Sequence, residues 1–196
     1  MMAKKLVVAI DGPAGAGKST VLQLVERFYD VDGGAIRVFG KDIRDYSRED
    51  LRRHLGYVEQ DSPVLSGTLR QNLTLGTPDA DDSSCLQALA MVKLDYLASR
   101  SPKGLDAVVG ESGAGLSGGE RQRAAIAVAL YHDPDIVLAD EPTAALDTRR
   151  ARDVARLLAD QTHELGKAAV MVTHDERLLP VCDRVLVMHD GVLAPR

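Results

Sequence analysis

The 196-residue chain contains no tryptophan, and aromatic residues make up only 4% of it. Surfaces on which nucleic-acid bases could stack are therefore scarce. The net charge is −5, so the composition also gives no support to a nucleic-acid partner, and we expect none. No apolar run approaches the roughly 18 residues that a membrane helix needs. The longest notable run is Ala124–Tyr131.

Cysteine is nearly absent too. Cys85 and Cys182 lie far apart in the sequence without metal-ligand spacing, which indicates two buried or incidental thiols in a cytosolic protein. The apolar run that follows Lys4 and Lys5 is too short for a signal peptide. With 45% hydrophobic and 27% charged residues, the composition is that of one globular domain of moderate size.

The most informative stretch, Gly12–Thr20, fits the pattern G-x-x-x-x-G-K-[ST] of a phosphate-binding loop. The apolar run Leu6–Ile10 before it predicts a buried strand, and Lys18–Tyr29 after it has the apolar spacing of a helix. Glycines let successive N–H groups point at a phosphate, and the helix N-terminus adds partial positive charge. The residues that we expect to hold a nucleotide phosphate are Gly12, Pro13, Ala14, Gly15, Ala16, Gly17, Lys18, Ser19 and Thr20.

Two side chains of this loop bring their own chemistry. Lys18 can neutralise the β- and γ-phosphates, and the Ser19 hydroxyl can join the coordination shell of Mg²⁺. The alternative is a glycine-rich turn without a ligand, but the strand before and the helix after it favour phosphate binding. Alone, the motif indicates a nucleotide and little more.

The remaining chain predicts a parallel α/β sheet with helices on both faces, because strand-length apolar runs alternate with helical patterns. The other predicted strands are 35–39, 56–59, 136–139, 168–172 and 184–188, and the predicted helices are 51–55, 67–73, 82–97, 118–130 and 148–165. Residues 67–97 contain no convincing strand, and 101–115 reads as a loop. We interpret 61–116 as a helical insertion into an α/β core made of 1–60 and 117–196.

The apolar run Ile136–Ala139 ends in two carboxylates, Asp140 and Glu141. Such a strand end would place Asp140 beside a metal held by Ser19, and Glu141 where a water attacking the γ-phosphate needs orienting. The alternative is a strand end capped by solvated acids, which is common for an isolated pair of this kind.

A second anion-binding pattern opens the helix predicted from residue 118. Ser117, Gly118 and Gly119 at a helix N-terminus form a second candidate anion cradle. The alternative is a plain helix cap in which Glu120 is the third-position partner of Ser117 in a capping box. Both descriptions can hold together.

Taken together, these stretches resemble the nucleotide-binding domain of ATP-binding cassette (ABC) transporters, whose signature sequence Leu116–Glu120 reproduces without change. Gln60 stands where the Q-loop glutamine would be, Ala144–Asp147 looks like the D-loop, and Val172–Asp175 looks like the switch-histidine segment. The resemblance implies a P-loop NTPase fold and a single ABC-type ATPase domain over residues 1–196, with the signature at the end of a helical subdomain.

The resemblance also implies roles for individual residues in an ATPase that uses Mg²⁺. Lys18, Gln60, Glu141 and His174 would be catalytic, with Glu141 the general base or water positioner; Ser19, Gln60 and Asp140 would organise Mg²⁺. In a head-to-tail homodimer or heterodimer, Ser117, Gly118 and Gly119 would close over the ATP of the other subunit, and Asp147 would communicate across the interface.

Residues 58–70 and the segment Val109–Gly113 look like exporter sequences, which implies a separate transmembrane domain as partner and a cytoplasmic location at the inner face of the membrane. The opening residues up to Thr20 look more like the N-terminus of a bacterial cytidylate kinase, and the family's N-terminal β subdomain and adenine-stacking aromatic residue are missing. The rival hypotheses are therefore a nucleoside monophosphate kinase and a trimmed or recombined nucleotide-binding fold without ATPase activity.

Overall fold

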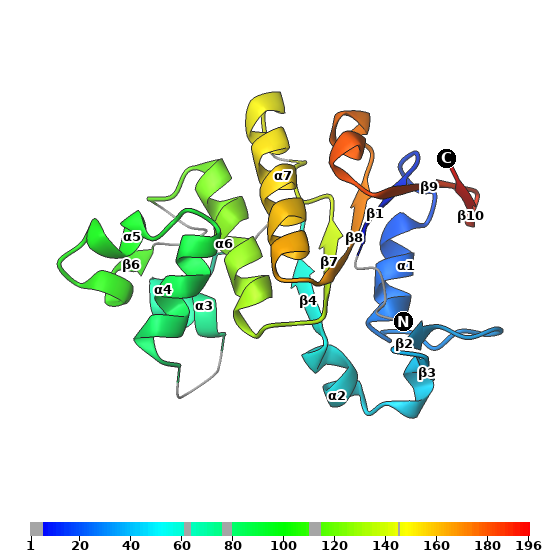
Figure 1. Cartoon of the computed structure of the whole chain (residues 1–196), viewed down its shortest axis with the longest axis horizontal. Coiled ribbons are helices and arrows are strands. Elements are labelled where there is room, and N and C mark those ends of the chain that lie inside the picture. The colour runs from blue at the N-terminus through cyan, green and yellow to red at the C-terminus, as the bar shows by residue number, and fades with distance from the viewer. Residues whose placement is uncertain (1–5, 61–63, 76–79, 110–114, 145) are drawn as a thin grey trace.

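A computed structural model describes residues 6–60, 64–75, 80–109, 115–144 and 146–196. Its centre is a six-stranded sheet in the order β10-β9-β1-β8-β7-β4 (Figure 1). The strands are β10 (Val192–Pro195), β9 (Arg184–His189), β1 (Val7–Asp11), β8 (Ala168–Thr173), β7 (Ile136–Asp140) and β4 (Leu55–Val58). All neighbours pair in parallel except β10 with β9. The carboxyl ends of the parallel strands therefore meet at one edge, where ligands of open α/β sheets bind.

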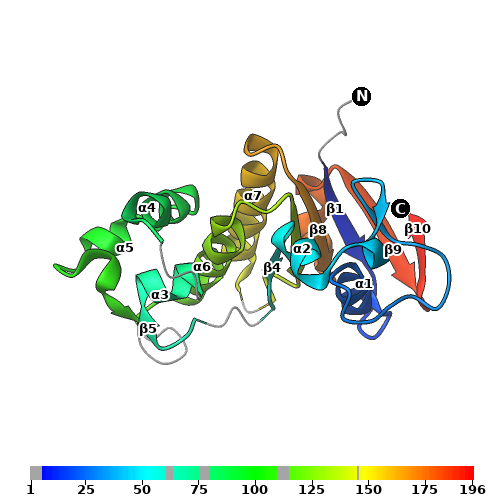
Figure 2. The same cartoon turned by 90° about the horizontal axis from the view of Figure 1, so that it is seen from below.

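Helices cover both faces of the sheet because side chains alternate along each strand. On one face Ile10, Leu138 and Val172 pack with Leu22 of α1 (Lys18–Val25). The opposite face packs against α6 (Gly118–Tyr131) and α7 (Thr148–Glu164), and it is formed by Val7, Val58, Val137, Ala139, Ala169 and Met171. Figure 2 shows this arrangement from below, with α1 and α7 on opposite sides of the strands.

A largely helical segment lies beside α6, away from the sheet (Figure 1). It contains α3 (Leu69–Thr74), α4 (Asp82–Met91), α5 (Tyr96–Ser99) and the 3₁₀ turn η2 (Gly104–Asp106). It also contains a two-residue ladder between β5 (Gly67–Thr68) and β6 (Val108–Val109), so the expectation of no strand in 67–97 and of a loop over 101–115 was wrong there. Arg70 of α3 forms ion pairs with Asp82 of α4, at 2.5 Å, and with Asp106 of η2, at 3.0 Å, which link these elements of the segment.

The remaining short elements lie at the bottom of Figure 1 or beside β9. They are β2 (Arg37–Val38), β3 (Lys41–Asp42), η1 (Ile43–Asp45), α2 (Arg48–Arg53) and the 3₁₀ helix η4 (Glu176–Val181). β2 pairs with β3 in a separate two-stranded sheet. Among the described helices, none is long and apolar enough to cross a membrane. Both cysteines are free thiols, Cys85 buried and Cys182 half-buried.

Several predicted elements are shorter than their sequence pattern suggests. The predicted helix 18–29 ends at Val25, because Arg27 takes a left-handed φ of 58° and its guanidinium donates to the carbonyls of Ile43, Arg44 and Tyr46. The predicted helix 82–97 breaks into α4 and α5 at Lys93, whose φ is also 58°. In place of the predicted strand 35–39 the structure has only the two residues of β2, and β10 was not predicted.

Candidate active site

The loop between β1 and α1 lies at the carboxyl edge of the sheet. Gly12 has φ 153°, and a methyl group built on it would lie 2.3 Å from the carbonyl oxygen of Met188 in β9. Gly17 caps α1 with φ 95°, a left-handed conformation that side chains rarely adopt. Only glycine suits Gly12, because the loop turns directly against the backbone of β9.

Lys18 points back into this loop and is only 7% exposed. Its ammonium donates to the carbonyl oxygens of Gly12, at 2.7 Å, and Pro13, at 2.9 Å. An ammonium has three donors, so a third N–H can serve a phosphate oxygen. The two carbonyl bonds hold the charge where the loop N–H groups converge.

Ser19 and Asp140 are 121 positions apart in sequence, yet the Ser19 hydroxyl donates to Oδ1 of Asp140 at 3.1 Å. The Tyr57 hydroxyl lies 3.5 Å from Oδ2 of the same carboxylate. Burial has the larger effect and the negative charge of Asp140 the next, and both raise the pKa of Tyr57 above its usual range. The Tyr57 hydroxyl therefore stays neutral and can donate a hydrogen bond. Tyr57 was not singled out from the sequence, because nothing but the pairing of β4 with β7 brings it here.

The Ser19–Asp140 pair has the chemistry that Mg²⁺ requires. A hydroxyl and a carboxylate oxygen are hard ligands, and Mg²⁺ is usually held by one or two carboxylates with water and substrate phosphates completing its shell. Within the described ranges, no group of three or more His, Cys, Asp or Glu side chains could hold a metal ion by itself. A phosphate-dependent metal site fits this donor set better than an all-protein cage.

Glu141 and His174 form a second pair at the same edge. The His174 Nδ1 lies 2.8 Å from Oε1 of Glu141, and the His174 backbone N–H approaches Oε2 at 3.4 Å. The Glu141 side chain is 12% exposed while that of His174 is 63% exposed, so the imidazole covers the carboxylate from the solvent side. Glu141 also has a left-handed φ of 46°, a conformation that costs energy in a residue with a side chain.

The predicted capping box is confirmed at the start of α6. The Ser117 Oγ accepts from the Glu120 N–H at 3.3 Å, and the Glu120 Oε2 accepts from the Ser117 N–H at 2.6 Å. The Ser117 hydroxyl also lies where it hydrogen-bonds the Glu120 carboxylate, while the N–H groups of Gly118 and Gly119 belong to the first turn, which lacks helical partners. These two N–H groups are suited to an anion, to which the Ser117 hydroxyl could turn.

Tyr96 of α5 donates its hydroxyl to Oε1 of Glu120 and so ties the helical segment to this cap. Burial raises the pKa of Glu120, but hydrogen bonds from Tyr96 and Ser117 outweigh it and bring the pKa to about 2. The carboxylate is therefore ionised and fixed in its capping role. Tyr96 was also missed in the sequence, where an aromatic residue 24 positions before Glu120 gives no signal.

The cap of α6 and the phosphate loop do not meet within one chain. In both ribbon views α7 lies between α6, which Ser117 caps, and α1, which begins at Lys18 (Figures 1 and 2). The fold brings together Lys18, Ser19, Asp140, Glu141 and His174 at one edge, but it leaves Ser117, Gly118 and Gly119 apart from them.

Gln60 and Asp147 flank these groups. Gln60 is exposed and lines a cavity of ≈ 400 Å³ together with Tyr57, Glu26 and Asp140, which puts it near the Ser19–Asp140 pair. Asp147 caps α7 by accepting from the Arg150 N–H at 3.0 Å. Of the exporter-like segment Val109–Gly113, only Val109, in β6, is described. Residues 110–113, residues 61–63 of the Q-loop stretch and Ala145 of the D-loop lie outside the described residues.

Comparison with known proteins matches the family described as "ABC transporter" over residues 2–144. The mitochondrial iron-sulfur clusters transporter ATM1 of Kluyveromyces lactis is 39% identical over 94% of this chain and 26% of its own length. P-glycoprotein 14 of Caenorhabditis elegans is 41% identical over 94% of this chain and 14% of its own. A solved bacterial Atm1-family ABC exporter with ATP bound superposes with a TM-score of 0.83 at 38% identity, covering 96% of this chain and 33% of that one.

The chain thus spans about a quarter or less of the curated relatives that it matches. The family match includes the opening residues from position 2, so the expected likeness of the N-terminus to a cytidylate kinase was wrong. The kinase hypothesis loses its support with it. Continuous similarity to exporters over nearly the whole chain and the shared α/β fold agree with each other. The chain therefore belongs to the ABC transporter family and is an ATP-binding P-loop ATPase domain that is similar to exporters over nearly its whole length.

Proposed function

We propose that the chain binds and hydrolyses ATP as a head-to-tail dimer, homodimer or heterodimer, and thereby powers export through a transmembrane partner domain. The observation that carries the proposal is the paired carboxylates at the end of β7. Asp140 contacts Ser19 of the phosphate loop, at 3.1 Å, and the next residue, Glu141, contacts His174, at 2.8 Å. The end of one strand thus supplies a carboxylate for the metal that binds the γ-phosphate and a second carboxylate for the water that attacks it.

Each of these residues has a role in the proposed reaction. The N–H groups of residues 12–20 and the Lys18 ammonium hold the phosphates and offset their charge. Ser19 and Asp140, with Gln60 nearby, would hold Mg²⁺, which draws charge from the β- and γ-phosphate oxygens when bound. Glu141 orients the attacking water and accepts its proton. An Nδ1–H of His174 would donate to the Glu141 carboxylate, 2.8 Å away, and a proton on Nε2 would let that nitrogen donate to the γ-phosphate.

The separation of the two anion sites supports a dimer. The cap of α6 carries exposed Ser117, half-buried Gly118 and buried Gly119, and α6 lies on the other side of α7 from α1, whose first residues belong to the phosphate loop. A second subunit related by a two-fold axis would bring this cap to the open side of the first subunit's ATP, and the reverse. Each complete site then needs both subunits, and Asp147 lies between the two kinds of half-site.

The partner and the location follow from the exporter relatives. We assign residues 61–116 to a helical subdomain and 1–60 with 117–196 to the nucleotide-binding core, on the cytoplasmic side of a membrane. By analogy with the exporter relatives, transport would take place through a transmembrane domain that works with this one. The transported substrate would be selected there.

The test is Glu141→Gln, which keeps size and hydrogen-bonding shape but removes the base. ATP binding should persist while hydrolysis falls by about 10²-fold or more, because the carboxylate acts only as water attacks. Size-exclusion chromatography should then show a monomer without nucleotide and a dimer with MgATP. Asp45→Asn, an exposed change in η1, is the control and should keep the parent rate. Hydrolysis by Glu141→Gln at the parent rate would contradict the assignment.

A further inference from the structure

The first turn of α7 packs directly on the cap of α6. A methyl group built on Gly118 would lie 3.6 Å from Cδ2 of Leu146, and one built on Gly119 would lie 3.6 Å from Cδ of Arg150. The signature motif and the start of α7 therefore form one unit within the chain. A second arginine, Arg121, has its Nη2 3.9 Å from a methyl group built on Gly118, but its Nη1 donates to the Leu116 carbonyl, whereas Arg150 has its aliphatic stem against Gly119.

Arg150 is held in place without being buried. Its backbone N–H donates to Oδ1 of Asp147 at 3.0 Å, and its guanidinium lies 3.3 Å from Oδ2. The side chains of Arg150 and Asp147 are 60% and 56% exposed. An ion pair this exposed is worth little, so the guanidinium can exchange Asp147 for another anion at small cost. Its aliphatic stem meanwhile stays against Gly119.

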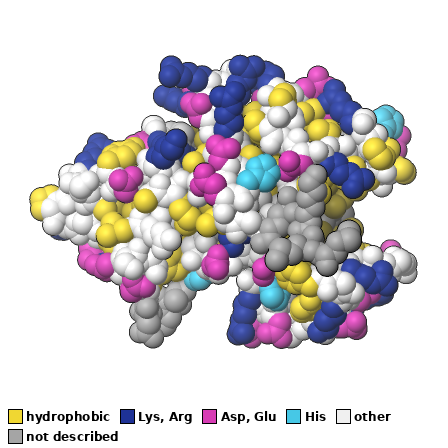
Figure 3. Space-filling view, viewed as in Figure 1, with side chains coloured by type: hydrophobic (Ala, Val, Ile, Leu, Met, Phe, Trp, Pro, Cys, Tyr) yellow, Lys and Arg dark blue, Asp and Glu magenta, His cyan; other side chains and the backbone are white. Residues whose placement is uncertain are grey.

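The charge distribution along α7 opposes the helix dipole. The helix has no acidic residue in its first turn. Exposed arginines gather in the first nine residues of α7, namely Arg149, Arg150, Arg152 and Arg156, with one exposed acidic residue, Asp153, among them. Figure 3 shows Lys and Arg side chains collected over this end of α7, although the chain as a whole has a net charge of −5. Positive charge at a helix N-terminus is unfavourable, so a binding role better explains it here than helix stability does.

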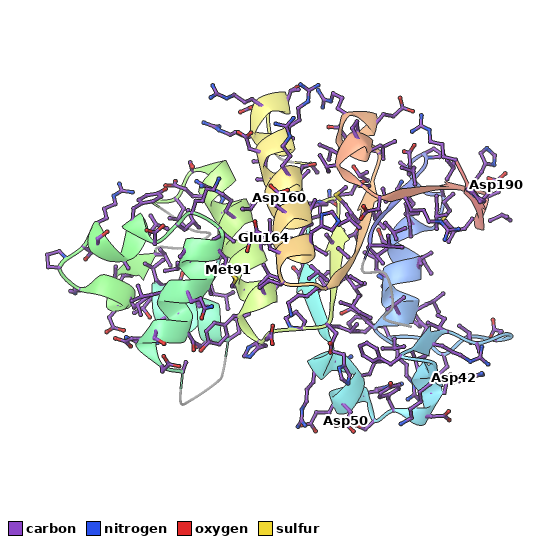
Figure 4. The ribbon with its side chains drawn as sticks, in the orientation of Figure 1. Asp42, Asp50, Met91, Asp160, Glu164 and Asp190 are labelled. Atoms are coloured by element: carbon purple, nitrogen blue, oxygen red, sulfur yellow. The ribbon has the colours of Figure 1, made fainter. Side chains whose placement is uncertain are left out.

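A groove of ≈ 600 Å³ lies between α6 and α7, and some of these arginines line it. Ser117, Gly119 and Arg150 line it together, while Arg152 does not. Asp160 and Glu164, labelled in Figure 4, line it in the C-terminal half of α7. Asp153 lines the groove too, as do the cationic side chains of Lys93, Arg123 and Arg156. With four cationic and three acidic side chains in the lining, and two of the acids in the C-terminal half of α7, the end where Arg150 and the α6 cap meet is the more favourable one for an anion.

We propose that Arg150 is a phosphate-binding residue of the signature half-site, donating from its guanidinium to the γ-phosphate of the ATP held by the other subunit. This inference rests on the proposed function and adds a charged donor to the neutral donors of Ser117, Gly118 and Gly119. Glu120 and Asp147 bring two negative charges close to where that phosphate would lie. Arg150 offsets them, and a guanidinium can donate two hydrogen bonds to one phosphate.

The experiment separates the charge of Arg150 from its packing. Arg150→Met keeps a stem against Gly119 but removes the charge, and Arg150→Lys keeps the charge on a similar stem. Arg152→Ala is the matched control, because it removes an exposed arginine from the same helix outside the groove. Each change is made in the Glu141→Gln variant. Dimer formation is followed by size exclusion across a series of MgATP concentrations, and nucleotide affinity of the diluted monomer is measured separately.

Arg150→Met should raise the MgATP concentration for half-maximal dimer about tenfold, the scale of one charge-assisted hydrogen bond. Arg150→Lys should recover part of the loss, and monomer affinity for ATP should not change, because the phosphate loop is untouched. In the parent chain, Arg150→Met should raise the ATP concentration at half-maximal hydrolysis.

Three results would overturn the inference while leaving the proposed function standing. They are a normal dimer with Arg150→Met, a lysine variant no better than the methionine variant, and an equal loss with Arg152→Ala. If Glu141→Gln itself forms no dimer with MgATP, then the proposed function fails and the role of Arg150 fails with it.

Discussion

Glu26, just beyond α1, should make the protein less stable as pH rises through neutrality. Its half-buried carboxyl lines the cavity beside Asp140, and burial raises its pKa to about 7, an effect opposed by Arg52 and reinforced by Glu59. In the unfolded chain the pKa is near 4.5. Between these values the folded protein binds more protons than the unfolded chain, so the free energy of unfolding falls with rising pH.

The magnitude follows from the shift. At about 1.36 kcal/mol per pKa unit, the full difference corresponds to about 3 kcal/mol. The side chain is only half-buried and solvent screens part of the effect, so we expect about 1 to 2 kcal/mol. The cost is fully present above pH 7 and is largely gone by pH 5, because protonation then relieves the buried charge in the folded state.

Glu26→Gln removes the charge in both states and should therefore stabilise the protein by about 1 to 2 kcal/mol at pH 8 but much less at pH 5. Urea unfolding followed by circular dichroism at the two pH values measures this as a shift in midpoint at constant slope. Glu49→Gln is the control, since the Glu49 side chain is 78% exposed. It should change stability by less than about 0.5 kcal/mol at both pH values. An equal effect of Glu26→Gln at pH 5 and pH 8 would refute the reasoning.

Two further substitutions probe the site directly. Lys18→Ala should weaken binding of MgATP by the monomer about 10²-fold, because a charge-assisted contact to the phosphates is lost; unchanged affinity in a calorimetric titration would count against the phosphate-loop assignment. Tyr96→Phe frees Glu120 from α5 and should raise the MgATP concentration for dimer formation about threefold to tenfold. Tyr46→Phe, which loses a 3.0 Å bond to the Val38 carbonyl far from the signature, should leave dimer formation unchanged.

The local patterns of the sequence predicted much of the fold. The strand before Gly12, the helix after it, the Ser117 capping box and the strands around positions 136–140, 168–173 and 184–189 all lie where apolar spacing and cap residues indicated. Membership of the ABC family was also readable, because Leu116–Glu120 and the phosphate loop are contiguous stretches. Local conformation depends on neighbours in sequence, so short motifs carry it.

The tertiary structure decided how distant residues meet. The sequence predicted Asp140 beside a metal held by Ser19, and parallel pairing of β1, β8 and β7 brings the two side chains into direct contact across 121 positions. Only the structure shows that His174 contacts Glu141, 33 positions away, at the same edge. Arg27 ends α1 early by donating to three carbonyls, and Arg150 settles against Gly119 because α6 and α7 pack together. No local spacing encodes such contacts, since each depends on the register of strands and the packing of helices far apart in the chain.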